Sequence, residues 1–156
     1  PKADIQRCLV HVMRNIAWKV RVSDRSIVLN DFKLIRKQSN KTDAMNCLND
    51  FISKWGKTYP KVIESLKGNE YLLTFFDYPE AIRPSIYTTN PIEGFNKNLK
   101  RKFKSKIQFP SEESLEKYLV SHFDEYNYKG SSRIFKGFGL VLAELQQKIV
   151  DKYLVS

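Results

Sequence analysis

The chain has 156 residues, a length that fits one domain with its own hydrophobic core. Hydrophobic residues make up 42% and aromatic residues 13% of it, which excludes a disordered tail. Lys and Arg number 27 against 17 Asp and Glu, so the formal net charge is +10. A positive surplus of this size favours a polyanionic partner, either nucleic acid or an anionic membrane surface.

The sequence also bears on location. No stretch approaches the roughly 20 apolar residues that a membrane span needs, and no signal-peptide pattern opens the chain. We therefore expect a soluble, cytoplasmic protein with no membrane partner. Cys8 and Cys47 are too few for a disulfide framework and are expected to be reduced thiols. Because the chain starts at Pro1 without a Met, we expect it to have been cut from a longer protein.

In chain order, the first expected element is a strand over residues 3–10, which partly alternate and lead into a helical pattern. Apolar spacing then predicts a helix over residues 12–22. Asp24 can cap the next helix. The expected apolar members of that helix are Ile27, Leu29, Phe32, Leu34 and Ile35.

Two more helices are predicted before a segment rich in aromatic residues. Thr42 can cap the first, which runs to Trp55 and is stopped by Gly56. Pro60 suits the first turn of the second, and Gly68 ends it. Residues 70–78 are dense in aromatic side chains and are expected to pack into the core.

The clearest helix start is Asn90-Pro91-Ile92-Glu93, because Asn suits the N-cap, Pro the first helical position and Glu a returning capping bond. This helix is expected to run to about Lys104. Further helices are expected over about 111–128 and 138–154. The expected buried side of the last helix carries Leu142, Leu145, Ile149 and Leu154. The predicted fold class is mainly α, a helical domain with about one N-terminal β-strand.

A helical wheel of residues 92–104 has two distinct sides. The expected core stripe consists of Ile92, Phe95, Leu99 and Phe103. The opposite side carries Glu93 together with Lys97, Lys100, Arg101 and Lys104, four positive residues that we call the basic ridge. A single acid therefore heads a basic surface.

Both features have a structural alternative. Glu93 can be a capping-box acid that also pairs with Lys97 one turn later. The basic ridge can be a solvated helix face, although like charges at i and i+4 repel and a structural helix gains nothing from them. A phosphate backbone would neutralise these charges, so periodicity alone leaves both interpretations open.

Several motifs resemble those of one protein family. Residues 86–96 read I-Y-T-T-N-P-I-E-G-F-N and are similar to the YTTN-x-IE-x-x-N signature of Mutator-like transposases. The C-L-V-H sequence from Cys8 to His11 resembles the family's C-x-x-H block, and Arg14-Asn15 follows it. Weaker matches occur in the right order around Trp55, residues 76–83, residues 109–111 and residues 139–145.

The resemblance implies a fold and an organisation. Such transposases have a ribonuclease-H-like core whose sheet carries two catalytic aspartates and whose later helix carries a glutamate, with a helical insertion between them. Residues 1–11 would be the last core strand and the C-x-x-H block. Residues 12–88 would be the helical insertion, and residues 89–156 the glutamate helix and the C-terminal helices. The chain would thus be the C-terminal part of that catalytic region, with both aspartates N-terminal to Pro1.

The resemblance also assigns roles. Glu93 falls on the signature glutamate, so it would be the catalytic carboxylate and a ligand of Mg²⁺ or Mn²⁺ in the full-length enzyme. The basic ridge would contact the DNA backbone. Cys8, His11, Asn90 and Asn96 belong to motifs without an assigned role. The expected partners are transposon-end and target DNA and other copies of the protein, in a prokaryotic, nucleoid-associated enzyme; the fragment alone is expected to be inactive and to bind no metal.

Other interpretations remain open. Cys8, His11, Cys47 and His122 could make a Cys₂His₂ zinc site, but Cys47 lies in an apolar stripe and the second pair is scattered, so zinc is not favoured. The chain could instead be a non-catalytic basic helical module that binds nucleic acid, with Glu93 only a cap. A third possibility is a protein-interaction domain with exposed aromatic residues.

Overall fold

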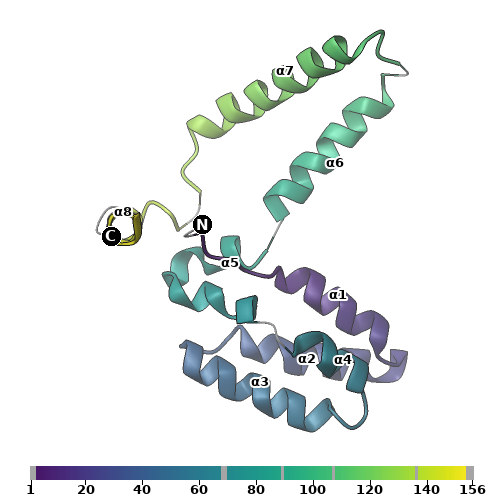
Figure 1. Ribbon diagram of the computed structural model, residues 1–156, viewed down its shortest axis with the longest axis vertical. Helices are drawn as coiled ribbons and strands as arrows, with labels where there is room; N and C mark the ends of the chain where they lie inside the picture. Colours follow the sequence, from purple (N-terminus) through teal and green to yellow (C-terminus); the bar gives the residue numbers. More distant parts are fainter. Residues whose placement is uncertain (1–2, 68–69, 89, 107, 136, 154–156) are drawn as a thin grey trace.

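The computed structural model describes residues 3–67, 70–88, 90–106, 108–135 and 137–153, without the side chains of Glu70, Asn90 and Pro91. Within these ranges the regular secondary structure is entirely helical. Figure 1 shows a body of packed helices, a pair of long helices (α6 and α7) extending from it, and a final helix (α8) to one side. No helix in these ranges has the length and apolarity that crossing a membrane requires.

Four helices form the body and enclose the hydrophobic core. They are α1 (Leu9–Lys19), α2 (Val22–Ile35), α3 (Lys41–Trp55) and α4 (Pro60–Leu66). Their most deeply buried side chains, at most 4% exposed, are Val12, Ile16, Val28, Phe32, Ile35, Ala44, Phe51, Val62, Ile63 and Leu66. Burial of these apolar faces, rather than helix propensity, holds the helices together.

Local signals explain where the body helices begin and end. Asn40, not Thr42, caps α3, and its side chain accepts a hydrogen bond from the Asp43 N–H at 2.8 Å. Pro60 lies in the first turn of α4 as predicted, because the proline lacks only an N–H that has no partner there. Helix α2 begins at Val22, two residues before the expected cap; Asp24 instead accepts a hydrogen bond from the Tyr59 hydroxyl.

The buried face of α2 differs from the predicted one. Ile27 and Leu34 are 56% and 46% exposed, whereas Val28 is fully buried. The helix starts earlier and its packing against α1 and α3 selects the stripe of Val28, Phe32 and Ile35. Trp55 is partly buried against the core, and its indole N–H donates to Asp31 at 2.9 Å.

The segment after α4 consists of short helical turns: η1 (Glu70–Leu72), η2 (Thr74–Asp77), η3 (Glu80–Ile82) and α5 (Arg83–Ile86). Its aromatic stretch packs into the core largely as predicted: Leu72, Leu73, Phe75 and Phe76 are buried, whereas Tyr71 is 45% exposed. The Arg83 guanidinium lies 4.9 Å from the centre of the Phe76 ring.

The strand expected over residues 3–10 is wrong. Residues 3–8 have no regular secondary structure and α1 begins at Leu9. The Gln6 side chain donates to the Leu72 carbonyl at 3.0 Å and accepts from the Phe75 N–H at 2.7 Å, so the segment bonds to helical turns. A strand needs a neighbouring strand, and the described residues supply none.

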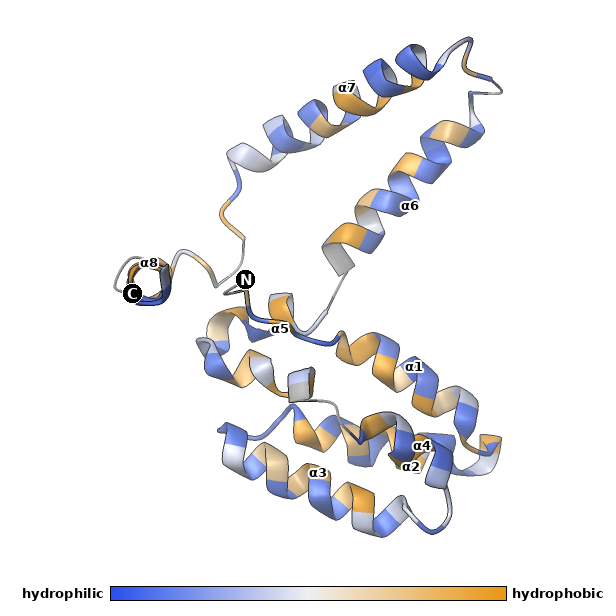
Figure 2. Ribbon diagram, viewed as in Figure 1, coloured by the Kyte–Doolittle hydropathy of each residue, from blue (hydrophilic) through white to orange (hydrophobic). Residues whose placement is uncertain are grey.

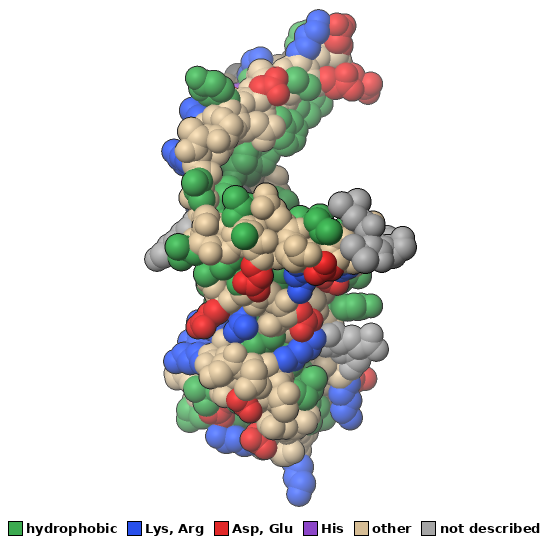
Figure 3. Space-filling model, turned by 90° about the vertical axis from the view of Figure 1, so that its left-hand side faces the viewer, with side chains coloured by type: hydrophobic (Ala, Val, Ile, Leu, Met, Phe, Trp, Pro, Cys, Tyr) green, Lys and Arg blue, Asp and Glu red, His purple; other side chains and the backbone are tan. Residues whose placement is uncertain are grey.

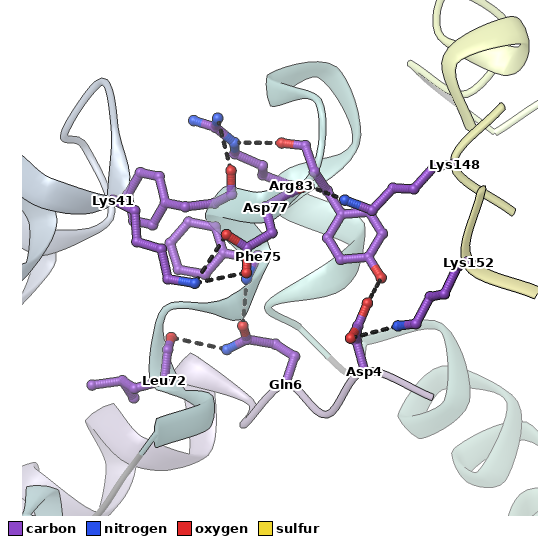
Figure 4. Close-up of polar contacts among 11 residues, drawn as sticks. Asp4, Gln6, Lys41, Leu72, Phe75, Asp77, Arg83, Lys148 and Lys152 are labelled. Atoms are coloured by element: carbon purple, nitrogen blue, oxygen red, sulfur yellow. Dashed lines mark hydrogen bonds and ion pairs between the residues drawn. The ribbon is translucent and has the colours of Figure 1, made fainter. Parts of the chain in front are cut away.

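Helix α8 (Leu142–Tyr153) is held by polar contacts (Figure 4). Lys152 lies 2.6 Å from Asp4, whose other carboxylate oxygen accepts from the Tyr78 hydroxyl at 2.6 Å. These two bonds hold the pKa of Asp4 below its usual value, while burial and the Asp4 contact raise the pKa of Tyr78 to about 12. Lys148 donates to the Asp77 carbonyl.

The prediction that the last helix is held by a buried apolar side is therefore largely wrong. The helix starts at Leu142 rather than about residue 138, and Leu142 and Ile149 are each 56% exposed. Leu145 is partly buried, and Leu154 lies outside the described residues. Gly137 leads into α8 with φ of 90°, and a Cβ there would lie 2.2 Å from the Ala81 carbonyl oxygen. Only glycine combines this left-handed backbone with so close an approach.

Helices α6 (Asn90–Lys104) and α7 (Glu112–Ser131) form an antiparallel pair with alternating hydrophobic and hydrophilic faces (Figure 2). Phe95 packs against Phe123 and Tyr126, with ring centres 5.2 and 4.7 Å apart. Phe103 packs against Tyr118 in the same way. The stripe predicted for α6 is thus confirmed at Phe95, Leu99 and Phe103, which are partly buried.

Ile92 does not belong to that stripe, because its side chain is 67% exposed.

Ser111 caps α7 through a bond from the Ser114 N–H, in agreement with the predicted start. Several apolar residues of α7 stay exposed, among them Val120, Phe123 and Tyr126. Figure 3, which views the side of α7 and α8, shows hydrophobic side chains gathered on this part of the molecule.

Replacing Phe103 with alanine tests the packing of the α6–α7 pair. Full burial of a phenylalanine makes its truncation cost roughly 3–5 kcal/mol. Because Phe103 is only partly buried, we expect Phe103→Ala to lower the free energy of unfolding by about 2 kcal/mol in urea denaturation. Lys100→Ala, on the exposed face, should change it by less than about 0.5 kcal/mol. Equal losses would show that the apolar side of α6 has been misplaced.

The pair should also respond to acid. Hydrogen bonds from Lys129 and Lys102 hold the pKa of Glu125 at about 2, below its usual 4.5. A depressed pKa means that this carboxylate contributes stability above about pH 4.5, and that the contribution is lost as pH falls toward 2. We expect Glu125→Gln to lower the urea midpoint at pH 7 and to flatten its decline in that acidic range. Glu116→Gln, an exposed acid of the same helix, is the control and should leave the pH profile unchanged.

Candidate catalytic and nucleic-acid site

One open face of α6 carries the residues singled out in the sequence. Glu93 lies in the first turn of the helix, followed along the same face by Asn96. A shallow hollow is lined by Glu93, Asn96, Lys97, Lys100, Arg101 and Lys104. The structure thus brings together the glutamate and all four residues of the basic ridge, as the helical period predicts.

The Glu93 carboxylate is only partly exposed and faces α1. His11 Nε2 lies 3.1 Å from Glu93 Oε1, and Arg14 Nη1 lies 4.0 Å from the same oxygen. The side chains of His11 and Glu93 are 52% and 36% exposed. The C-x-x-H block therefore reaches the signature glutamate through its histidine. Arg14, which follows the C-x-x-H block in sequence, had no predicted role, although its spacing of three residues from His11 places both on one face of a helix.

The backbone fixes this encounter. The Leu9 N–H donates to the Tyr87 carbonyl at 2.9 Å, which ties the start of α1 to the segment that leads into α6. The Tyr87 ring meets Phe75 edge-on, with ring centres 5.0 Å apart, and the Arg36 guanidinium lies over its face. Thr88 Oγ1 donates to the Pro84 carbonyl at 2.9 Å. The first part of the signature is thus bound to the core.

Not every basic residue of α6 faces the hollow. Lys102 turns toward α7, where its Nζ lies 3.0 Å from both Glu125 Oε2 and His122 Nδ1. Arg101 lies at the boundary between the two faces and donates to Asn98 at 3.2 Å. The run of positive charge is therefore divided between a bond within the helix pair and the exposed ridge.

The remaining motif residues do not assemble into a site. Cys8 precedes α1 and is partly buried, while Cys47 lies on α3, where burial raises the pKa of its thiol. His122 lies on α7 beside Lys102. In the part of the chain that the structure describes, no three His, Cys, Asp or Glu residues come close enough to share a metal ion. The side chain of Asn90, and with it the capping prediction, lies outside the described residues.

Comparison with known proteins bears on most of the chain. Residues 1–131 match the family described as Transposase, Mutator family. The chain is 50% identical over 139 residues to the transposase for insertion sequence element IS905 of Lactococcus lactis, an alignment covering 89% of this chain and 36% of that protein. It is 53% identical over 120 residues to the IS1201 transposase of Lactobacillus helveticus, an alignment covering 76% of this chain and 32% of that protein.

A more distant relative is the ISRM3 transposase of Rhizobium meliloti, which is 34% identical over 137 residues, or 85% of this chain and 34% of that protein. The chain thus spans about a third of the length of these relatives. The match covers the C-x-x-H block, the body helices, the Y-T-T-N-P-I-E sequence and the basic ridge together. With this coverage and identity, the chain belongs to the Mutator family of transposases.

Proposed function

We propose that this chain is part of a DNA-cleaving and DNA-joining transposase and supplies one catalytic carboxylate, Glu93, and a DNA-contacting surface, the basic ridge. The observation that carries the proposal is the shared face of α6, on which one partly exposed acid precedes four positive side chains. The relatives named as transposases of insertion sequences support a reaction on DNA.

The chemistry explains why an acid would stand among cations. Divalent ions bound by carboxylates can assist in-line attack on a phosphodiester and stabilise both the attacking and the leaving oxygen. An oxygen ligand such as Glu93 suits Mg²⁺ or Mn²⁺, but one carboxylate cannot hold two ions, so the other ligands must come from residues outside this chain. The basic ridge would meanwhile bind the flanking phosphates and align the strand.

The packing agrees with a division of labour within the chain. Among the described residues, every buried side chain lies between Leu9 and Ile82, and α6, α7 and α8 have none. We assign the body to the helical insertion, and α6 to the catalytic helix of a ribonuclease-H-like core whose sheet lies in the rest of the protein. The chain by itself would then be inactive. Its full-length form would act in the bacterial cytoplasm on transposon ends and target DNA as a homo-oligomer.

The role of Glu93 is tested in the full-length transposase. Glu93→Gln removes the charge that binds a cation but keeps the size of the side chain. Strand cleavage should therefore be abolished, while binding to the transposon ends stays unchanged or tightens slightly. Glu112→Gln, at an exposed acid in the first turn of α7, is the matched control and should cleave normally. Normal cleavage by Glu93→Gln would favour the alternative, a non-catalytic module in which this acid only caps α6.

Substitutions in the basic ridge should affect DNA binding rather than cleavage chemistry. Changing Lys97, Arg101 and Lys104 together to alanine should weaken DNA binding for all sequences, because phosphate contacts carry no base information. Each lost phosphate contact lowers the salt slope of log K by about 0.9, or roughly 3 in total.

The control for the basic ridge is a triple alanine variant of Lys37, Lys57 and Lys61. These are exposed lysines of the body, and replacing them removes the same net charge. Its salt slope should change much less. If both triple variants lose the same slope, net charge rather than the basic ridge attracts the DNA.

A further inference from the structure

Two side chains of α1 converge on one oxygen of the acid that heads the basic ridge. His11 Nε2 and Arg14 Nη1 lie 3.1 and 4.0 Å from Glu93 Oε1. We propose that His11 is a positioning residue that holds the Glu93 carboxylate in the orientation needed to bind a divalent cation, with the more distant Arg14 adding a positive charge beside it. The inference rests on the proposed function of Glu93 and gives the C-x-x-H block a mechanical role.

The donor stands on a rigid support. On α1, Leu9, Val12 and Ile16 are 5%, 3% and 0% exposed, so one face of this helix is fixed in the core. The Leu9 N–H to Tyr87 carbonyl bond also sets the start of α1 against the segment before α6. His11 therefore projects from an element that cannot shift without disturbing the core.

The acceptor, in contrast, belongs to a weakly packed helix. None of the described side chains of α6 is buried, and its partly buried aromatic rings, Phe95 and Phe103, meet α7 rather than the body. A glutamate side chain has several rotatable bonds, and ordering it costs conformational entropy. A donor from α1 limits both the rotation of the carboxylate and the movement of the first turn of α6 relative to the body.

The contact is better suited to positioning than to stabilisation. With 52% of His11 and 36% of Glu93 exposed, water screens the pair, and such pairs contribute little to folding. A carboxylate offers about four acceptor positions, so donors from α1 and a cation can share it. Partners that hydrogen-bond a metal-binding carboxylate orient it, and their loss typically weakens metal affinity or activity about 10- to 100-fold.

The test uses the full-length transposase and measures two quantities: Mn²⁺ affinity by electron paramagnetic resonance titration, and the Mg²⁺ concentration that gives half-maximal cleavage of its transposon ends. We expect His11→Ala to weaken both about 10- to 100-fold, with cleavage recovering at high Mg²⁺. His11→Gln, whose amide can donate from a similar position, should retain most of the Mn²⁺ affinity and of the Mg²⁺ response that His11→Ala loses. Arg14→Gln should have a smaller effect because Arg14 is farther from the oxygen. DNA binding without divalent ions should be unchanged in all three.

Two controls keep the outcomes distinct. His122→Gln makes the same change at the other histidine, which lies on α7 away from Glu93, and should leave Mn²⁺ affinity unchanged. In a Glu93→Gln background, His11→Ala should have no further effect on Mn²⁺ affinity, since the carboxylate it holds is absent. Thermal unfolding of each variant is measured alongside and should match that of the unaltered protein, which separates loss of metal binding from loss of the fold.

Three results would overturn the inference: unchanged Mn²⁺ affinity in His11→Ala, a loss in His11→Gln as large as in His11→Ala, or an undiminished effect of His11→Ala in the Glu93→Gln background. If these occur while Glu93→Gln is inactive, the proposed function stands and only the role of His11 fails. If Glu93→Gln cleaves normally, the function itself fails.

Discussion

The hydrogen bond from the Leu9 N–H to the Tyr87 carbonyl joins the first helix of the body to the segment that leads into α6. Both partners are themselves anchored, Leu9 by burial in the core and Tyr87 by its contacts with Phe75 and Arg36. Two motifs far apart in sequence are therefore held at one place. The meeting of His11 with Glu93 follows from this bond, because the two side chains project from helices whose starts it fixes relative to each other.

Electrostatics divides the positive charge of α6 into two uses. Lys102 is bound to Glu125 on α7, and this acid is also within reach of Lys129. The four residues of the basic ridge remain on the open face with Glu93. Like charges at this spacing repel within an isolated helix, so the ridge lowers helix stability slightly and would be relieved by a bound polyanion. The arrangement makes more physical sense as a binding surface than as a structural device.

Packing differs between the two parts of the chain. The body buries a continuous apolar core, whereas α6 and α7 meet through pairs of aromatic rings and leave Val120, Phe123 and Tyr126 exposed. Helix α8 is held mainly by Lys148 and Lys152, which reach Asp77 and Asp4. Exposed apolar surface of this kind usually marks a place where other protein or ligand is met. The aligned part of this chain covers only about a third of the length of its relatives.

Much of this protein is determined locally by its sequence. Pro60 and Ser111 set helix starts because they act on their own backbone neighbours, and the helical period alone places Glu93 on one face with the basic ridge. The Y-T-T-N-P-I-E motif likewise indicated the family without any structure. Only the tertiary structure decided the rest. Residues 3–8 form an irregular segment, not the predicted strand, because their hydrogen-bond partners are helical turns. Helix α2 buries Val28 where the sequence predicted Ile27 and Leu34, and Ile92 is exposed. The contact of His11 with Glu93 depends on the packing of distant helices, which no local pattern encodes.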